Sequence, residues 1–341
     1  MSSANPLLQR PVLQADLGRV EDALRRSVVA DDPFLTQVAS HLIAAGGKRV
    51  RPAFAITSAA TAVAAMEPVS NEVIMGAVSV ELVHLGSLYH DDVMDDATTR
   101  RTVESVNARW GNLTAILAGD YLLAKASEIA ASLGTEVAGL LAATIGRLCE
   151  GQILELQHAF DLDRTEAAYL SSIDGKTASL LGTACRIGGI VAGLPRPQID
   201  ALTTFGNGFG MAFQIVDDLL DVTSTDEELG KPAGHDLVEG TYTLPVIRTL
   251  AGGGEPAAEL TSVLRRLQPT DGSIEPVDDP EALAAARMLL RASPAVAESL
   301  GVARGFVETG LAALAPFAGT EAVTALEAAA EHLLGTVDAA G

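Results

Sequence analysis

The sequence is poor in aromatic residues, cysteine and positive charge. Its 341 residues are 48% hydrophobic, yet only 4% are aromatic. Two cysteines, Cys149 and Cys185, are too few for a disulfide scaffold, and we expect both to be ordinary small buried side chains. There are 44 acidic but only 23 basic residues, which gives a formal net charge of −21. Nucleic-acid binding needs a basic face, so this balance argues against a nucleic-acid partner.

The sequence also lacks a recognisable signal for export or membrane insertion. Its N-terminus does not have the basic and then apolar pattern of a signal peptide. Arg186 breaks one apolar run and Gln214 dilutes another, so we expect no run that is long and uniform enough to span a bilayer. An anionic membrane surface would repel so acidic a chain on average. We therefore expect a soluble, cytoplasmic protein without an integral membrane segment.

Helical periodicity, in contrast, is abundant. Apolar residues recur with a 3.6-residue period in the segments 13–29, 54–66, 72–94, 112–132, 137–160, 166–194 and 199–222. Alternating β-branched runs, which would indicate strands, are almost absent. An irregular stretch at 269–280 precedes a C-terminal helical portion at about 281–336. These patterns predict an all-α bundle, with a site between facing helices.

The pentad Asp-Asp-x-x-Asp occurs twice, each time inside an apolar segment that we predict to be helical. The six carboxylates belong to Asp91, Asp92, Asp95, Asp217, Asp218 and Asp221. Positions four apart share a helix face, and like charges at that spacing destabilise a helix, so a compensating cation is expected. Clustered carboxylates without histidine or cysteine suit Mg²⁺, which shares its other positions with phosphate oxygens. Two such clusters would clamp a magnesium diphosphate in a central cavity between two Asp-rich helices.

Two other interpretations of the pentads are less consistent with the sequence. A single acidic run is most often a solvated helix face. Two identical spacings, each embedded in hydrophobic sequence, argue against that interpretation here. A calcium hand would need a loop of alternating oxygen ligands around a central glycine, and the sequence has no such loop.

Basic residues cluster at positions that suit phosphate binding. In the run from Gly46 to Pro52, three cations follow a glycine pair that allows close backbone approach to a phosphate. Arg100 and Arg101 follow the first pentad directly, where they would hold phosphate groups beside the metal. The alternatives are a basic surface loop for the first cluster and a salt-bridge patch for the second.

Two lysines lie in more isolated positions. Lys176 precedes Thr177 in an otherwise apolar helical segment, where a lysine usually extends to solvent. Lys231 lies in the segment 226–245, which glycine and proline punctuate as a loop. Long loops over a site are candidate lids, so Lys231 is placed to reach a metal-bound phosphate.

Taken in order, these motifs resemble those of the trans-isoprenyl diphosphate synthases, the polyprenyl synthetase family. The resembling stretches are GGKRVRP, HDDVMDDATTRR, GDYLLAKA, KTASL, FQIVDDLLD and GKPAGHDLVEGTYTLP. Their detail is most similar to actinobacterial long-chain polyprenyl diphosphate synthases. The resemblance implies a single domain over 1–341 with catalytic motifs at 46–245. It also implies an isoprenoid synthase-type helical bundle, and a homodimer that joins an allylic diphosphate to isopentenyl diphosphate.

The resemblance further implies roles for individual residues. The six aspartates match the metal-binding motifs, with three Mg²⁺ per site once diphosphate is bound. The positions that bind isopentenyl diphosphate are matched by Lys48, Arg51, His84 and Arg101. The positions that hold the allylic diphosphate are matched by Arg100, Lys176 and Lys231. The positions that line the developing allylic cation are matched by Thr177 and Gln214.

Some positions depart from the family pattern, although no metal ligand is lost. Thr241 replaces a lysine that often touches diphosphate near the end of the lid. Thr102 replaces the glycine after the paired arginines. The usual Gly-Glu-x-x-Gln reads Gly151-Gln152-x-x-Glu155, an exchange of acid and amide. We still expect an active enzyme.

Product length in this family depends on the bulk beneath the first pentad, where short-chain enzymes tend to have an aromatic residue. The position five residues before Asp91 is Gly86, and Val83, a turn earlier, is also of modest size. We therefore expect an open floor and a medium- or long-chain all-trans product, with a short-chain, geranylgeranyl-type synthase as the alternative. Gly86 can also be explained as a close helix–helix contact.

Two further function classes fit the sequence less well. A terpene cyclase shares the fold but typically replaces the second pentad and lacks the isopentenyl site. A non-catalytic partner subunit usually loses one acidic motif. Both pentads and the glycine-led basic run are present here, so the elongating synthase is the preferred interpretation.

Overall fold

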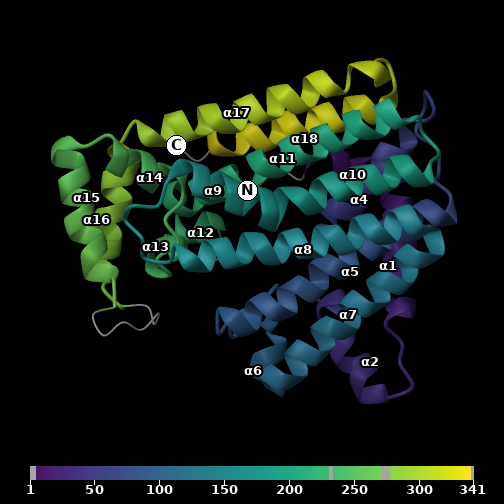
Figure 1. Ribbon diagram of the computed structural model, residues 1–341, viewed down its shortest axis with the longest axis horizontal. Helices are drawn as coiled ribbons and strands as arrows, with labels where there is room; N and C mark the ends of the chain where they lie inside the picture. The colour runs from purple at the N-terminus through teal and green to yellow at the C-terminus, as the bar shows by residue number, and fades with distance from the viewer. Residues whose placement is uncertain (1–4, 230–232, 270–276, 339–341) are drawn as a thin grey trace.

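Almost all of the ordered structure is helical, as the periodicity predicts. The computed structural model describes residues 5–229, 233–269 and 277–338. The longer helices of the bundle are α1 (Pro11–Ser27), α4 (Val50–Ala60), α5 (Asn71–Met94), α7 (Asn112–Leu133), α8 (Thr135–Gln157), α10 (Ser179–Val191), α11 (Arg196–Thr223), α17 (Ala295–Ala313) and α18 (Glu321–Asp338). Figure 1 shows α8 and α17 running along the length of the molecule, with α7 inclined to them.

Shorter elements connect these helices. They are η1 (Pro6–Gln9), α2 (Pro33–Ala39), α3 (His41–Ala44), α6 (Val106–Trp110), α9 (Glu166–Ile173), η2 (Asp174–Ala178), α12 (Asp226–Leu229), α13 (His235–Val238), α14 (Leu244–Ala251) and η3 (Ala315–Phe317). A small hairpin joins β1 (Thr99–Arg100) to β2 (Val103–Glu104), with Thr99 opposite Glu104 and Arg100 opposite Val103. The predicted helix at 166–194 is continuous, but its middle turn, η2, is π-helical.

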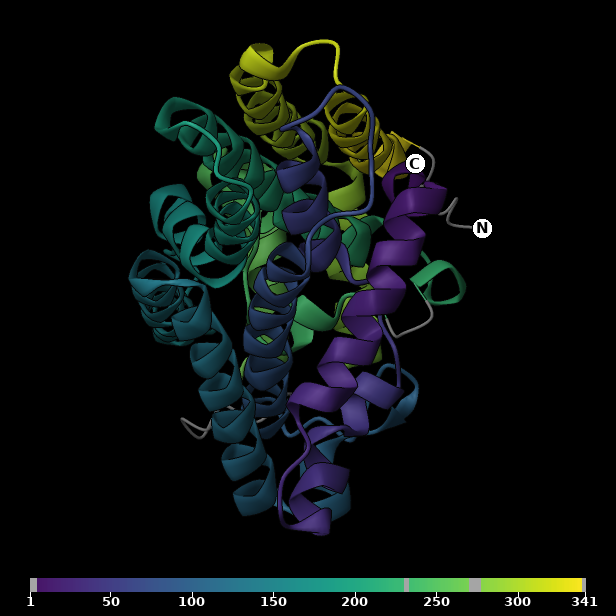
Figure 2. The ribbon, with the colours of Figure 1, turned by 90° about the vertical axis from the view of Figure 1, so that its right-hand side faces the viewer.

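Helix α5 lies at the centre of the bundle. Its N-terminus is capped by Ser70, whose hydroxyl accepts from the backbone N–H of Val73. Apolar residues occur on all of its faces, the pattern of a helix surrounded by others. It packs against α1, α4, α7 and α10, and α10 packs in turn against α11. Figure 2 shows α1 along one side of this arrangement.

A second, smaller hydrophobic core lies at one end of the molecule. Helices α15 (Gly254–Leu267) and α16 (Pro280–Ala292) pack on each other there and on α14. Their core contains Tyr242, Leu260, Leu264, Ala286 and Leu290, all fully buried. We call α15 and α16 the satellite pair. The irregular stretch predicted at 269–280 falls between them, and residues 270–276 of it lie outside the described structure.

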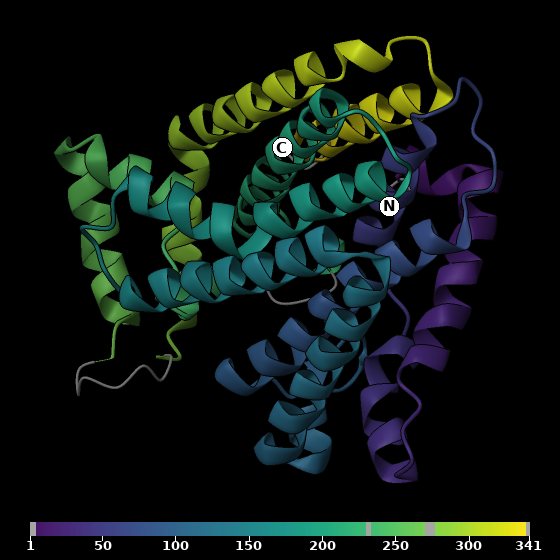
Figure 3. The same ribbon diagram turned by 45° about the vertical axis from the view of Figure 1, so that its right-hand side comes forward.

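Two helices are long and apolar enough to cross a membrane by length and composition, contrary to the expectation from sequence. They are α5 and α8. The apolar window of α5 is 72% buried inside the protein, as in the core helix of a soluble protein. The window of α8 is only 22% buried. Figure 3 shows α8 on the outside of the bundle beside α7, so α8 presents an apolar face that the described residues do not cover.

Candidate active site

Both pentads lie at the C-terminal ends of long helices. Asp91 and Asp92 are in the last turn of α5, and Asp95 is its C-cap, with its N–H donating to the carbonyl of Asp91. The second pentad occupies the last two turns of α11. The C-terminal end of a helix carries partial negative charge, so carboxylates there are electrostatically unfavourable without a cation. The predicted helical setting of both pentads is confirmed.

The middle aspartate of each pentad is buried and bonded to protein groups. Asp92 is fully buried, and its Oδ1 accepts from Nε of Arg100 at 2.6 Å. Asp218 accepts from the hydroxyl of Tyr169 at 2.6 Å and from Nε2 of Gln214 at 2.8 Å. Asp221 is also buried, and its Oδ2 accepts from the backbone N–H of Asp236 at 3.2 Å.

The remaining aspartates are more accessible. Asp91 is half-buried, while Asp95 and Asp217 are exposed. Although the side chain of Asp95 reaches solvent, the surrounding protein removes part of its hydration and raises its pKa to about 6, and the neighbouring charges of Glu239 and Asp91 add to the rise. Burial likewise raises the pKa of Asp91. Ionising these groups is therefore costly, and a divalent cation bound nearby would lower that cost.

The donor atoms of the pentads fit a hard cation, but only together with further ligands. Within the described residues, no three histidine, cysteine or carboxylate side chains converge closely enough to hold a metal ion alone. Mg²⁺ usually takes one or two carboxylates and fills its other positions with water and phosphate oxygens. The accessible carboxylates of Asp91, Asp95 and Asp217 suit that partial role.

An ion pair lies between the two pentads. Nζ of Lys176 donates to Oε1 of Glu155 at 2.5 Å. The charge of Glu155 acts on the pKa of both Asp91 and Asp218, and raises both, after burial as the main cause. Lys176 opposes the rise at Asp91. The charge of Glu155 thus links the two acidic clusters electrostatically.

Lys176 and Thr177 belong to the π-helical turn η2, a feature that often marks functional sites. A Cβ on Gly151 of α8 would lie 2.4 Å from the backbone nitrogen of Lys176, so glycine is needed where α8 crosses this turn. Thr177 donates to Oε1 of Gln214 at 2.8 Å. The two residues predicted to line the allylic cation are thus in direct contact.

Arginines and one histidine gather near the start of α4. Burial, followed by the charges of Arg51 and Arg101, holds the pKa of His84 well below its usual range, so this imidazole is neutral at pH 7. Arg51 is half-buried, and its Nε has no hydrogen-bond partner among the described residues. Lys48 is exposed. Burial lowers the pKa of Arg51, and the charges of Glu81, Arg101 and Asp91 all act on it. A guanidinium with a free Nε donor is suited to binding an anion.

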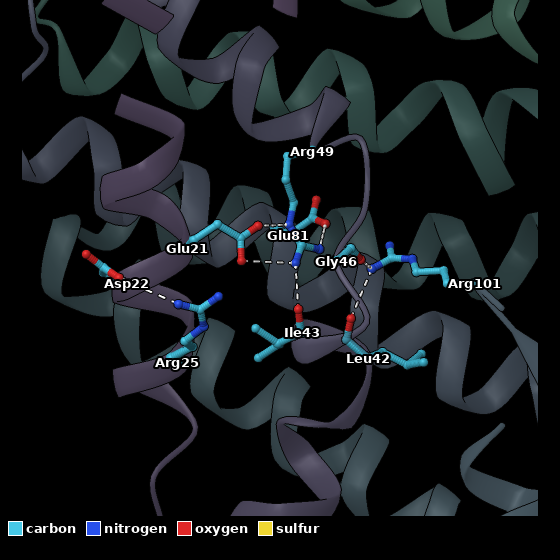
Figure 4. A network of polar contacts seen from close by, with 9 residues as sticks. All are labelled: Glu21, Asp22, Arg25, Leu42, Ile43, Gly46, Arg49, Glu81 and Arg101. Carbon is cyan, nitrogen blue, oxygen red and sulfur yellow. Dashed lines mark hydrogen bonds and ion pairs between the residues drawn. The ribbon is translucent and has the colours of Figure 1, made fainter. Parts of the chain in front are cut away.

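The other two arginines of this region, Arg49 and Arg101, form hydrogen bonds or ion pairs with protein groups (Figure 4). Arg49 is buried, pairs with Glu21, and donates to Glu81 at 2.9 Å. It is thus a structural member of the basic run. Arg101 donates to the carbonyl oxygens of Gly46 and Leu42. A Cβ on Gly47 would lie 2.8 Å from Cζ of Arg101, which explains the second glycine of the turn.

Several predicted positions differ in setting from the expectation. Gly86 lies at the crossing with α7, where an added Cβ would be 3.1 Å from the carbonyl oxygen of Gly119 and from Cγ of Leu123. This geometry favours the explanation of Gly86 as a close helix–helix contact. Val83 is fully buried. Lys231 lies outside the described residues.

The departures from the family pattern also have local consequences. Thr102 adopts a positive φ of 65°, a left-handed conformation that glycine accepts more easily than threonine. Thr241 donates its N–H to the carbonyl of Asp236 at 2.8 Å. Glu155 pairs with Lys176 as described. The sequence motifs did not indicate the participation of Arg164 or Tyr169, because neither lies in a recognisable pattern.

Comparisons with known proteins identify the relatives of this chain. A family model described as polyprenyl synthetase matches residues 32–289. A nonaprenyl diphosphate synthase from Mycobacterium tuberculosis is 39% identical over 85% of this chain and 83% of its own. Component 2 of a heptaprenyl diphosphate synthase from Geobacillus stearothermophilus is 40% identical over 76% of this chain and 83% of its own.

A solved structure gives the same result for the fold. It is a polyprenyl synthase from Caulobacter crescentus complexed with calcium and isoprenyl diphosphate. The two chains share 32% identity and a TM-score of 0.86, with 98% of each covered. This likeness confirms the all-α, isoprenoid synthase-type bundle. Because the family model and both relatives span most of its length, the chain belongs to the polyprenyl synthetase family of prenyltransferases.

Proposed function

We propose that this enzyme condenses isopentenyl diphosphate with an allylic diphosphate to give a medium- or long-chain all-trans polyprenyl diphosphate. The observation that carries the proposal is the meeting of two acidic helix ends at the Lys176–Glu155 pair, beside a group of arginines. Membership of the family and the printed names of the relatives support the same reaction and the same range of product length.

Magnesium ions are the proposed cofactor, with three per site once diphosphate is bound. The accessible Asp91, Asp95 and Asp217 are the best candidates for direct ligands. The other three aspartates of the two pentads are buried and bonded to protein groups, which supports a role in orienting neighbouring residues. They are Asp92, Asp218 and Asp221. Bound metal would neutralise the charge that develops on the leaving diphosphate.

Two groups of residues are proposed to bind the two substrates. The proposed isopentenyl site consists of Lys48, Arg51, His84 and Arg101. The charges of Arg51 and Arg101 both lower the pKa of His84, which supports this grouping. The allylic diphosphate site consists of Arg100, Lys176 and Lys231, of which the first two lie beside pentad residues. Proton loss after condensation needs no side chain with a shifted pKa, because released diphosphate can accept the proton.

The allylic cation is proposed to form near the contact between Thr177 and Gln214. Their oxygen dipoles lie in a buried to half-buried setting, where oriented dipoles act more strongly than in water. Exclusion of water from this region protects a carbocation from capture. Product length is proposed to depend on the region below the first pentad, although the packing of Gly86 against α7 supports a structural role for that residue.

A cytoplasmic homodimer is the proposed assembly. The uncovered face of α7 and α8 supports it, because large apolar side chains there are exposed: Leu113, Ile116, Leu117, Ile153 and Leu156. An exposed apolar face of this kind marks an interaction surface. The relative from Geobacillus stearothermophilus is one component of its synthase, so a second, different subunit is the competing partner.

One incubation tests the proposal. The purified chain is mixed with Mg²⁺, labelled isopentenyl diphosphate and each allylic primer in turn, and the products are sized. Labelled medium- or long-chain products are expected from the chain alone. No incorporation by a homodimer with any primer would refute the proposed reaction. Short products alone would refute the proposed length, and activity that needs an added subunit would refute the homodimer.

A further inference from the structure

A buried arginine lies behind the second pentad, outside every motif described above. The side chain of Arg164 is 4% exposed. Its Nη1 donates to the carbonyl oxygen of Tyr242 at 3.0 Å, while Nε and Nη2 have no hydrogen-bond partner among the described residues. The guanidinium carbon lies 5.5 Å from the centre of the Tyr169 ring. Burying a cation with unmatched donors is costly, so its contact with Tyr169 is of interest.

Tyr169 connects this arginine to the pentad. Its ring is 1% exposed, and its hydroxyl donates to Oδ2 of Asp218 at 2.6 Å. Burial raises the pKa of this phenol well above its usual value, so the hydroxyl keeps its proton and remains a donor. The other oxygen of Asp218 accepts from Nε2 of Gln214 at 2.8 Å. Oε1 of Gln214 then accepts from Thr177.

This chain fixes which end of the Gln214 amide faces which neighbour. Burial raises the pKa of Asp218 to about 7, and the hydrogen bonds from Tyr169 and Gln214 oppose that rise. In its ionised form the carboxylate can only accept hydrogen bonds, so ionised Asp218 requires the NH₂ end of Gln214. The carbonyl oxygen of Gln214 is thereby turned toward Thr177. The oxygen end of an amide stabilises nearby positive charge, whereas the NH₂ end would destabilise it. A flipped amide would therefore oppose the formation of a carbocation.

We propose that Arg164 and Tyr169 are positioning residues for prenyl transfer, which hold Asp218 so that Gln214 keeps its carbonyl oxygen toward the developing cation. The inference rests on the proposed function. Both residues are almost fully buried, so their proposed effect on the reaction is indirect. Both act through Asp218, and Asp218 acts through the amide of Gln214.

The test is a double-mutant cycle between Tyr169 and Gln214. Tyr169→Phe removes only the hydroxyl and keeps the ring beneath Arg164. Loss of a supporting hydrogen bond of this kind is expected to lower kcat by about 10- to 100-fold. The KM values for both diphosphates should stay within about twofold, because the cations that hold them are unchanged. In a Gln214→Ala background the same change should cost less than about twofold, since coupled residues are not additive.

Tyr242→Phe is the matched control. Tyr242 is a fully buried tyrosine of the satellite core, and its hydroxyl contacts Gln268 rather than a pentad. This variant should keep the kcat of the wild type. Equal losses of kcat from Tyr169→Phe in both backgrounds would overturn the proposal, as would a loss expressed mainly in KM or one matched by Tyr242→Phe.

Two further measurements keep the test decisive. If Tyr169→Phe does not fold, Asp218→Asn replaces it. Asp218→Asn is then expected to lower kcat in the wild-type background but not in the Gln214→Ala background. Equal losses of kcat in the two backgrounds would again overturn the proposal. Arg164→Lys should retain more activity than Arg164→Gln if the cation over the ring supports Tyr169, and equal activity would remove Arg164 from the inference. Failure of the wild type to transfer prenyl groups would instead refute the proposed function.

Discussion

Lys176 and Glu155 form a 2.5 Å ion pair, and the charge of Glu155 acts on Asp91 at the end of α5 and on Asp218 at the end of α11. Although burial lowers the pKa of Lys176, the charge and hydrogen bond of Glu155 raise it above its usual value. The ammonium group is therefore fully charged but already paired. A diphosphate that binds Lys176 must compete with Glu155 or share the cation with it.

Glu155→Gln should strengthen binding of the allylic diphosphate. The change frees Lys176 and removes a negative charge beside the phosphate, so the KM for the allylic substrate should fall by up to about tenfold. Steady-state kinetics with varied primer measure it. Glu150→Gln, an exposed change on the same helix, should leave this KM unchanged. A KM that stays constant or rises in Glu155→Gln would show that the ion pair positions Lys176 for binding.

Removing an accessible carboxylate from either pentad should stop turnover without harming the fold. Asp91→Ala and Asp217→Ala each lose a proposed metal ligand, and each relieves negative charge at a helix C-terminus. We expect undetectable product and a thermal midpoint equal to or above that of the wild type. Asp22→Ala, on the exposed face of α1, serves as the control for both measurements. Normal activity of either pentad variant at limiting Mg²⁺ would contradict the two-cluster site.

Mutations of the three cations of the basic run should affect different properties: substrate binding for Lys48 and Arg51, and stability for Arg49. Lys48→Ala and Arg51→Ala should each cost about 1.5–3 kcal/mol of isopentenyl diphosphate binding, which corresponds to roughly a 10- to 150-fold higher KM. The KM for the allylic primer should change far less. Equal effects on both substrates would show that the loop is not a dedicated site.

Arg49→Ala is the structural counterpart of that experiment. It leaves Glu81 buried without its cation, and breaking a buried pair typically costs about 3–5 kcal/mol of stability. The expected result is a clear drop in the denaturation midpoint, measured by circular dichroism. A stable Arg49→Ala enzyme with a raised KM for isopentenyl diphosphate would instead make Arg49 a substrate-binding residue.

Gly86→Phe should destabilise the protein before it shortens the product. An added Cβ already approaches α7 within 3.1 Å, and overpacking of this kind costs about 1–3 kcal/mol. Gly139→Ala, where the added Cβ has open space, should instead raise the thermal midpoint. Product sizing of the surviving enzyme completes the test. A shorter product at unchanged stability would restore Gly86 to the floor of the tunnel.

The reactivity of the two cysteines can test whether a second subunit covers the apolar face of α8. Cys185 is buried, and burial raises the pKa of its thiol to about 12, so it should resist thiol reagents in the native protein. The expectation that both cysteines are buried is wrong for Cys149, which is exposed within this chain, one turn before Ile153. In a homodimer through α8 we expect Cys149 to be protected as well, and to become reactive in Ile153→Glu. Rapid reaction of Cys149 in the wild-type dimer would place the interface elsewhere.

The sequence predicted the features that depend on local spacing. The helical pentads follow from i, i+4 periodicity, and the glycine pair before Lys48 follows from the demands of a close turn. The partners of Arg49 could not be predicted, because Glu21 and Glu81 are distant in sequence and meet it only through packing of α1 and α5 against α4. For the same reason the sequence could not decide whether Gly86 faces a product tunnel or packs against another helix.

The sequence also could not predict which aspartates of the pentads form hydrogen bonds with protein groups. All six aspartates have the same chemistry and near-equivalent spacing, yet Asp92 and Asp218 are turned toward protein donors. Rotation about a helix distinguishes them only when the surrounding helices are known. The π-helical turn at Lys176 has no sequence signal of its own, because it arises where α8 and Gly175 approach closely.

The satellite pair holds the end of the helix that carries the second pentad. Arg287 and Arg291 of α16 both donate to the carbonyl oxygens of Val222 and Ser224, at the end of α11. A small separate core of this kind can open as its own cooperative unit while the main bundle stays folded. The last turn of α11 would then lose its caps whenever the satellite opens. Amide hydrogens there would exchange with solvent at the opening rate of α15 and α16, and the order of the second pentad would thereby depend on a small core outside the main bundle.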